Sequence, residues 1–226
     1  MLFDNNGLDV GRAKFVYDMP ASEPQSLYTS GGKRLLDTLL VLLALPIILP
    51  IMIVVAAVVM LDGGSPIYSQ MRLGRGWKKF RLFKFRTMRP DGDAILAAHL
   101  AADPGARAEW DMNQKLRNDP RITRAGRFLR KTSLDELPQL INVLLGSMSL
   151  VGPRPMMLEQ RVLYPGTYYA AHRPGLTGLW QISARSGSTF AARALYDERY
   201  YRELSLRLDL STIFRTFAVV ARCTGC

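Results

Sequence analysis

Two adjacent carboxylates, Asp135 and Glu136, open an otherwise apolar segment, T-S-L-D-E-L-P-Q-L-I-N-V-L-L-G, which covers residues 132–146. An ionised aspartate held beside cations can attack a phosphoryl group, and a neighbouring glutamate can bind a divalent cation together with the phosphates. The pair also has a structural interpretation, because Ser133 and Glu136 have the S-x-x-E spacing of a capping box and acids stabilise a helix N-terminus. The local sequence leaves the catalytic and the structural role open.

Several cations could neutralise a phosphate bound near these acids. Arg154 lies in G-P-R-P, where two prolines restrict the backbone and hold the guanidinium for bidentate phosphate binding. Lys84 and Arg86 lie in K-F-R-T-M, which fits either a cationic clamp for a diphosphate or a solvated edge strand. A basic amphipathic helix is predicted over residues 124–131, and its cations fit membrane headgroups as well as a substrate.

The charge balance indicates an anionic partner. The 226 residues carry 30 Lys and Arg against 19 Asp and Glu, a net charge of +11, and 48% of them are apolar. Nucleic acid, a phosphate-bearing small molecule and an anionic membrane surface all fit that charge. The sequence suggests no recognition helix or stacking platform, so we expect no nucleic-acid partner. The two cysteines, Cys223 and Cys226, do not make a disulfide framework, and the sequence has no P-loop or dinucleotide fingerprint.

Residues 39–61 form a run of 23 consecutive apolar residues. As a helix this run would extend about 35 Å, enough to cross a bilayer core of roughly 30 Å. Pro46 and Pro50 lie near its middle and each removes a backbone donor, so we expect a sharp bend and a broken helix. Both flanks are basic, which favours the cytoplasm for both. A re-entrant helix that returns on the same side satisfies both flanks, and a kinked spanning helix is the alternative.

The rest of the sequence predicts an α+β protein that is predominantly α with a small β element. We expect a mobile N-terminal tail over residues 1–30, the membrane helix over residues 31–62, and a cytosolic domain with membrane-surface helices over residues 63–220. The most strand-like stretch is F-R-L-F-K-F-R, residues 80–86. Helices are predicted over residues 93–102, 103–117, 124–131, 133–145 and 196–220.

Taken together, these segments resemble the bacterial sugar transferases, also called small monotopic phosphoglycosyl transferases, over about residues 31–216. Each motif is weak alone, but their presence together and in order is specific. The motifs are K-R-L-L-D (33–37), the apolar run, D-G-G-S-P-I-Y (62–68), R-L-G-R (72–75), F-K-F-R-T-M (83–88), S-L-D-E-L-P-Q-L-I-N-V-L (133–144), M-S-L-V-G-P-R-P (148–155) and R-P-G-L-T-G-L-W-Q (173–181). The likeness is greatest to enzymes that start exopolysaccharide repeat units.

The resemblance implies a two-step reaction that requires Mg²⁺. A sugar 1-phosphate moves from a UDP-sugar to undecaprenyl phosphate, and UMP is released. Asp135 would be the nucleophile that forms a phosphosugar-enzyme, and Glu136 would be an acid–base partner or, with Asp135, a metal ligand. Arg154 would bind phosphate, and Lys84 and Arg86 would line the anionic site. Galactose is the first expectation for the sugar and glucose the second.

The resemblance also implies a place on the cytoplasmic face of the bacterial inner membrane, next to anionic lipids. In the family the apolar run is a re-entrant helix that enters one leaflet and breaks at a Ser-Pro pair. Here Pro50 follows Leu49, which has no hydroxyl to bond a freed carbonyl, and Pro46 adds a second kink. The oligomeric state stays open, with a homo-oligomer as one alternative.

A second hypothesis is a membrane-anchored scaffold or regulator of polysaccharide assembly that keeps the fold without the chemistry. A protein freed from catalysis would tolerate loss of the reacting side chains. The presence of Asp135, Glu136 and Arg154 therefore favours the enzyme.

Overall fold

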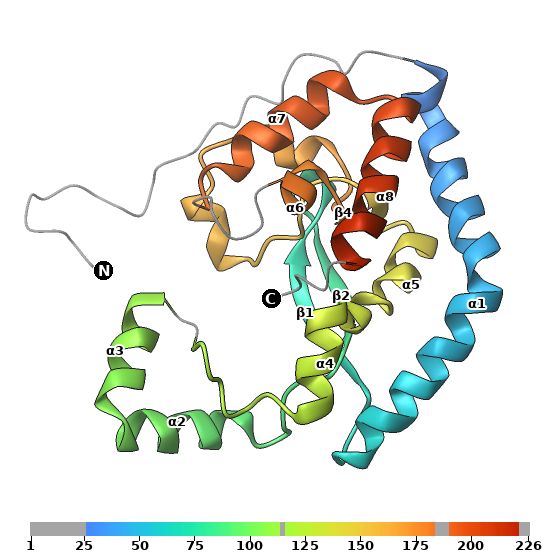
Figure 1. Cartoon of the computed structure of the whole chain (residues 1–226). Helices are drawn as coiled ribbons and strands as arrows, with labels where there is room; N and C mark the ends of the chain where they lie inside the picture. Colours follow the sequence, from blue (N-terminus) through green and yellow to red (C-terminus); the bar gives the residue numbers. More distant parts are fainter. Residues whose placement is uncertain (1–25, 114–115, 184–189, 222–226) are drawn as a thin grey trace, which may run out of the picture.

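The computed structural model describes residues 26–113, 116–183 and 190–221, and it shows a mainly helical protein with two small sheets. A long helix, α1 (Lys33–Leu61), lies along one side of a domain formed by later parts of the chain (Figure 1). A helical arm, α2 (Gly92–Ala102) and α3 (Pro104–Asn113), extends away from the domain (Figure 1). The expectation of an α+β protein with little sheet is confirmed.

The domain combines short helices with short strands. Its helices are α4 (Arg124–Thr132), α5 (Gln139–Leu144), α6 (Leu179–Ser183), α7 (Arg193–Glu203) and α8 (Leu206–Ala221). Its strands are β1 (Ile67–Leu73), β2 (Lys79–Phe85), β3 (Ser149–Val151) and β4 (Gly175–Thr177). A π-helical turn, η1 (Tyr28–Gly32), precedes α1, and the 3-10 turns are η2 (Arg75–Trp77), η3 (Leu134–Glu136), η4 (Glu159–Leu163) and η5 (Tyr168–Ala171).

Each sheet has two strands. β1 and β2 form an antiparallel hairpin of seven residue pairs, and the strand predicted over residues 80–86 corresponds to β2. β3 and β4 pair in parallel, with Ser149 opposite Gly175. A Cβ atom at Gly175 would lie 2.1 Å from the backbone nitrogen of Gly152, so a side chain does not fit at this crossing. The parallel pair therefore brings the M-S-L-V-G-P-R-P and R-P-G-L-T-G segments into backbone contact.

The prediction of a broken membrane helix is wrong in one respect, because α1 is continuous through Pro46 and Pro50. The helix changes direction near its middle and curves around the domain (Figure 1). A stripe of apolar side chains with three- and four-residue spacing packs on the domain from both halves of α1: Val41, Leu45, Ile48, Met52, Val55 and Val59. Because this packing holds the helix on both sides of the prolines, the lost donors bend it without ending it.

Both ends of α1 are attached to the same domain. Near its N-terminus, Arg34 donates to two carbonyls at the C-terminal end of α5, those of Val143 and Leu144. One turn later, the carboxylate of Asp37 accepts a hydrogen bond from the hydroxyl of Ser149 at 2.7 Å. At the other end, the guanidinium of Arg86 donates to the carbonyl of Val59 at 3.0 Å. The full length of α1, about 43 Å, is thus held against one domain.

Two predicted helices are each divided in the structure. The helix predicted over residues 133–145 is interrupted by Pro138, which has no backbone N–H, so that η3 precedes the proline and α5 follows it. The helix predicted over residues 196–220 consists of α7 and α8, and the backbone leaves the helical conformation at Leu204.

The predicted ends of two other segments also differ. α3 ends at Asn113, where the prediction extended to residue 117. The predicted N-terminal tail, residues 1–30, lies mainly outside the described residues, and its last positions already belong to η1. Cys223 and Cys226 also lie outside the described residues.

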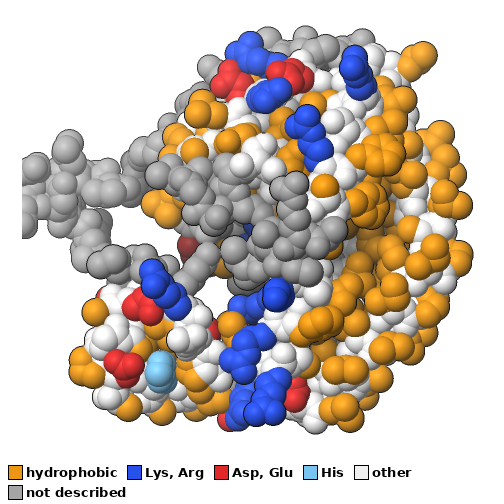
Figure 2. Space-filling view, viewed as in Figure 1, with side chains coloured by type: hydrophobic (Ala, Val, Ile, Leu, Met, Phe, Trp, Pro, Cys, Tyr) orange, Lys and Arg blue, Asp and Glu red, His pale blue; other side chains and the backbone are white. Residues whose placement is uncertain are grey.

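The outer face of α1 is apolar and exposed. The described part of the chain contains one helical segment long and apolar enough to cross a membrane, Tyr28–Leu61. Leu43, Ile47 and Ile53 are among its well exposed side chains. Figure 2 shows this surface as an apolar band over α1, beside a group of Lys and Arg side chains. An exposed apolar surface of this length is typical of contact with a membrane or a partner.

Candidate active site

Lys84 lies beside both adjacent acids. Its ammonium nitrogen is 2.7 Å from Oε1 of Glu136 and 3.6 Å from Oδ2 of Asp135. β2 carries Lys84, and η3, which carries the two acids, packs on this strand. Nη2 of Arg154 lies 3.8 Å from the same glutamate oxygen. The structure therefore brings four of the predicted site residues together, although they come from three separate segments of the chain.

The carboxyl group of Asp135 is largely removed from water, with 7% of the residue exposed. Burial raises its pKa, the charge of Lys84 lowers it, the neighbouring charge of Glu136 raises it and Arg130 lowers it. The net direction is upward, because the loss of hydration outweighs the two nearby cations. Once ionised, a carboxylate with few water molecules around it has little hydration to lose before it attacks a phosphorus atom.

The predicted capping box does not form. Ser133 ends α4 in the left-handed conformation, with φ 59°, and its side chain makes no capping hydrogen bond. Its backbone carbonyl instead accepts from the amide of Glu136 at 3.2 Å, which closes the turn η3. The S-x-x-E spacing thus belongs to a junction between α4 and η3, and the carboxylate of Glu136 is engaged by Lys84.

Asn142 fixes β2 against the helix that follows the acids. Its side-chain oxygen accepts from the amide of Phe83 at 3.0 Å, and its side-chain nitrogen donates to the carbonyl of Arg81 at 2.7 Å. The residue is 1% exposed. Because both bonds go to the backbone of β2 near Lys84, Asn142 determines how the cation approaches the acids. Asn142 stands within the S-L-D-E-L-P-Q-L-I-N-V-L motif, but its role as a brace is not visible from the sequence.

α4 directs a second cation toward the acids. The helix approaches the segment after β2 so closely that a Cβ atom at Gly126 would lie 2.1 Å from the carbonyl oxygen of Thr87. The hydroxyl of Thr87 accepts from Nε of Arg130 at 2.9 Å. Arg130 is close enough to Asp135 to lower its pKa. The sequence predicts the basic helix but does not distinguish Arg130 from its other cations. The four-residue spacing between Gly126 and Arg130 is the signal that places both on the inner face.

The structure does not bring Arg86 into contact with the two acids among the described contacts, and its predicted role in phosphate binding stays a prediction. β2 ends at Phe85, and the amide of Arg86 still donates to the carbonyl of Pro66 at 2.8 Å. The guanidinium of Arg86 donates to the carbonyl of Val59 near the end of α1.

Asp135 and Glu136 fit a Mg²⁺ ion that is shared with a phosphate substrate. Among the described residues no group of three or more His, Cys, Asp or Glu could form a metal site from protein ligands alone. Mg²⁺ is commonly bound by one or two carboxylates, with phosphate oxygens and water completing the shell. Glu136 is the more accessible of the two ligands, since its side chain is 22% exposed and that of Asp135 is 11% exposed.

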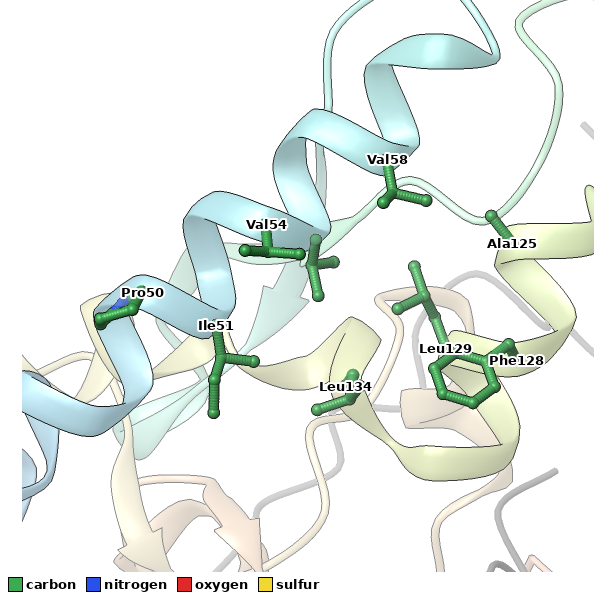
Figure 3. Close-up of a pocket in the computed structure, with 9 residues that line it drawn as sticks. Pro50, Ile51, Val54, Val58, Ala125, Phe128, Leu129 and Leu134 are labelled. Atoms are coloured by element: carbon green, nitrogen blue, oxygen red, sulfur yellow. The ribbon is translucent and has the colours of Figure 1, made fainter.

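An apolar cavity of about 420 Å³ lies between α1 and α4, beside the acids. Its lining residues are Pro50, Ile51, Val54, Val55, Val58, Ala125, Phe128, Leu129 and Leu134. Figure 3 shows Val54 and Val58 on α1 facing Leu129 and Phe128 on α4, with Leu134 at one end of the space. Leu134, which directly precedes Asp135 in the sequence, is the lining residue that lies nearest to the acids along the chain.

Comparison with known sequences identifies a family. Residues 28–223 match the model of the bacterial sugar transferase family. This range includes every residue described above in the acid–cation group and in the cavity.

Individual relatives are similar to the chain at several levels of identity. It is 46% identical over 195 residues to a UDP-galactose-lipid carrier transferase of Erwinia amylovora, covering 85% of the chain and 41% of that protein. It is 43% identical over 197 residues to the exopolysaccharide production protein ExoY of Sinorhizobium fredii, covering 86% and 87%. It is 37% identical over 214 residues to a UDP-glucose:undecaprenyl-phosphate glucose-1-phosphate transferase of Escherichia coli, covering 89% and 42%. The chain thus spans less than half of the first and third relatives and most of the second.

Proposed function

The chain belongs to the bacterial sugar transferase family, and we propose that it transfers a hexose 1-phosphate from a UDP-sugar to undecaprenyl phosphate. The products are undecaprenyl-diphosphate-hexose and UMP. The observation that carries the proposal is the buried Asp135 beside Lys84 and Glu136, at the end of an apolar cavity. The names of relatives that act on UDP-sugars, lipid carriers and undecaprenyl phosphate support it.

In the first step an oxygen of the Asp135 carboxylate attacks the sugar-bearing phosphorus of the UDP-sugar. The bond between this phosphorus and the bridging oxygen breaks, and UMP leaves with the bonding electrons. The product is an acyl phosphate, a mixed anhydride of the Asp135 carboxyl group and the sugar phosphate. Lys84 and Arg130, which flank the carboxylate, reduce its repulsion from the phosphate and stabilise charge in the transition state.

In the second step a phosphate oxygen of the lipid attacks the same phosphorus. The bond to Asp135 breaks, and the carboxylate is restored for another cycle. Asp135 accepts the phosphosugar in the first step and the lipid phosphate accepts it in the second. Both transfers occur at the same phosphorus atom, so one set of cations can serve both. Arg154 contributes a further guanidinium on the side of Glu136.

We assign a Mg²⁺ requirement to the same site. Glu136, with Asp135 beside it, would hold the ion, which when bound neutralises charge on the phosphates. Lys84 contacts the same carboxylate at 2.7 Å and would help to orient it toward the ion.

The proposed location is the cytoplasmic face of a bacterial inner membrane, where anionic lipids meet the basic surface. Here α1 would be re-entrant, with its apolar outer face in one leaflet. Both ends of α1 bind the same domain, through Arg34 and through Arg86. A spanning α1 would carry polar parts of that domain into the hydrocarbon, which is costly.

The apolar cavity is suited to the first isoprene units of the lipid. Its walls carry no charged or polar side chain, and its inner end lies at Leu134, next to the proposed nucleophile. A lipid whose phosphate reaches Asp135 must leave the site by an apolar path, and the cavity between α1 and α4 provides one (Figure 3).

We further propose that the reaction starts an exopolysaccharide repeat unit, with galactose as the first sugar to test and glucose as the second. The higher identity to a relative named for UDP-galactose than to one named for UDP-glucose supports this order. A homo-oligomer remains part of the hypothesis to be tested.

The function is tested by incubating the purified full chain with radiolabelled UDP-galactose or UDP-glucose, undecaprenyl phosphate and Mg²⁺. We expect UMP release and a labelled lipid. Release of no UMP with either sugar nucleotide would contradict the enzyme hypothesis and favour the membrane scaffold.

A further inference from the structure

Three arginines that belong to separate segments lie close enough for their charges to interact, and two of them face Trp180. Arg72 comes from β1, Arg154 from the loop after β3, and Arg193 begins α7. The guanidinium carbon of Arg193 lies 4.3 Å from the centre of a Trp180 ring, and that of Arg154 lies 5.9 Å from it. β1 is joined to the loop that carries Arg154, because the amide of Leu73 donates to the carbonyl of Met156 at 3.0 Å.

The cluster has too few anionic partners for its three charges. In the described part of the chain its one ion pair is the 3.8 Å contact of Arg154 with Glu136, whose oxygen already accepts from Lys84 at 2.7 Å. Arg72 binds the neutral side chain of Gln70, and its Nε is buried without a hydrogen-bond partner. Nε of Arg193 is likewise buried without a partner. Buried donors of this kind cost free energy when they stay unpaired.

Two other acids face the cluster without neutralising it. The charge of Glu159 raises the pKa of Arg72, and the charge of Asp197 raises the pKa of Arg193. Both acids act at longer range than an ion pair. The carboxylate of Asp197 accepts from the hydroxyl of Tyr164 at 2.7 Å, and burial raises its pKa to about 7. Asp197 is therefore only partly ionised near neutral pH.

The three guanidinium groups repel one another. Burial and then the charge of Arg154 lower the pKa of both Arg72 and Arg193, in the second case to about 10. A pKa of about 10 leaves Arg193 charged at neutral pH. Like charges held near one another, with unpaired buried donors, are typical of a site whose counter-charge is a ligand. Guanidinium groups bind phosphate oxygens in bidentate geometry.

We propose that Arg72, Arg154 and Arg193 form a second anion subsite, which holds the nucleotide phosphate that leaves in the first step. The inference rests on the proposed function. Arg154 belongs to both subsites, since it contacts Glu136 on one side and faces Trp180 on the other. The sugar phosphate lies at Lys84 and Arg130, and the nucleotide phosphate lies at the arginine cluster. The leaving phosphate thus gains its counter-charge as its bond breaks.

The phosphate of the lipid acceptor has the same chemistry, so the experiment separates the two sources. The first arm measures formation of the phosphosugar-enzyme from the UDP-sugar, and its reversal by UMP. The second arm measures discharge of a preformed phosphosugar-enzyme by undecaprenyl phosphate. A third, independent arm measures binding of UMP alone to the full chain by calorimetry.

Two variants, Arg193→Gln and Arg72→Gln, should each weaken UMP binding and slow adduct formation at least tenfold, with discharge to the lipid within twofold of the wild type. The matched control is Arg199→Gln, an exposed arginine on the same helix that pairs with Glu203. Slowing of discharge alone would assign the cluster to the lipid phosphate, and equal slowing of both arms, or unchanged UMP binding in both variants, would overturn the nucleotide subsite. Wild-type protein that binds UMP but forms no adduct would contradict the proposed function and leave the subsite standing.

Discussion

The ammonium nitrogen of Lys84 lies 2.7 Å from Glu136, from which it is separated by 52 positions in the sequence. The same nitrogen lies 3.6 Å from Asp135. One cation on a strand thus links two adjacent acids on a helical turn. This relationship gives the two acids different environments, because Glu136 is held in a direct ion pair while Asp135 is more deeply buried and keeps a raised pKa. These different environments fit Asp135 as the proposed nucleophile and Glu136 as the proposed metal ligand.

Removal of the lysine charge should change the pH dependence of the reaction. Lys84 lowers the pKa of Asp135, so Lys84→Met raises that pKa further. Attack requires the ionised carboxylate, and the acidic limb of kcat/KM should therefore move to higher pH. At the optimum we expect a loss of about 10- to 100-fold. The measurement is UMP release between pH 5.5 and 9.

The control for this variant is Lys79→Met, an exposed lysine at the start of the same strand. It removes one positive charge from β2 without touching the acids. An acidic limb that stays in place in Lys84→Met, or moves equally in both variants, would contradict the assignment.

Asn142→Ala should destabilise the protein by about 2 to 4 kcal/mol, because it leaves a backbone donor and a backbone acceptor of β2 unpaired in a buried site. Thermal unfolding in detergent measures the change, with Ser69→Ala on the exposed part of the hairpin as the control, expected within about 0.5 kcal/mol. Activity should also fall, since the amide bonds position the strand that carries Lys84. A variant as stable and as active as the control would show that Asn142 does not brace the site.

The sequence was sufficient to predict most of the proposed active site but not its assembly. Asp135, Glu136 and Arg154 stand in motifs whose residue types indicate phosphate chemistry, and the structure brings Lys84 to them. The brace through Asn142 depends on tertiary contact between β2 and α5, which local spacing does not encode. The contact of Arg86 with the carbonyl of Val59 likewise depends on the folded chain, because α1 and the end of β2 meet only there.

The two ends of α1 should lie on one side of the membrane, because both bind the same domain. Single cysteines at Ser26 and at Ser65, in a chain with Cys223→Ser and Cys226→Ser, test this arrangement. Both should be shielded from a membrane-impermeant maleimide in intact cells and become reactive after lysis. Reaction at one end alone in intact cells would show that the helix spans the bilayer.

A bulky side chain in the apolar cavity should impair the lipid step selectively. Val54→Trp is expected to raise KM for undecaprenyl phosphate about tenfold by occupying space for the lipid chain, while adduct formation from the UDP-sugar stays unchanged. Ile53→Trp is a matched control, since both positions are 62% exposed on α1 and Ile53 does not line the cavity. Equal effects of the two substitutions on the lipid KM would assign the loss to membrane association.

The shape of α1 illustrates another limit of prediction from sequence. Pro46 and Pro50 correctly indicated a disturbed helix, and the bend in Figure 1 agrees with them. Their effect on continuity depends on the apolar stripe that packs on the domain on both sides of the bend. In the same way, the arginine cluster could not be found from the sequence, because Arg72 and Arg193 meet only through the folded chain.

The variant Asp135→Asn removes the proposed nucleophile with little change in shape. The folded-state pKa of Asp135 is raised, so the stability from this group is full below its unfolded-state pKa and is lost as pH rises through the folded-state value. Asparagine does not ionise, and the variant should therefore be as stable as the wild type or more stable at pH 8. A melting temperature well below that of the wild type would indicate a structural role.

The central claim is tested most directly by intact-protein mass spectrometry after incubation with the UDP-sugar in the absence of lipid acceptor. The wild type should gain the mass of one hexose phosphate, which fragmentation places on Asp135 and which undecaprenyl phosphate removes. Asp135→Asn should gain no mass and release no UMP. An adduct that persists in Asp135→Asn, or that maps to another residue, would contradict the account.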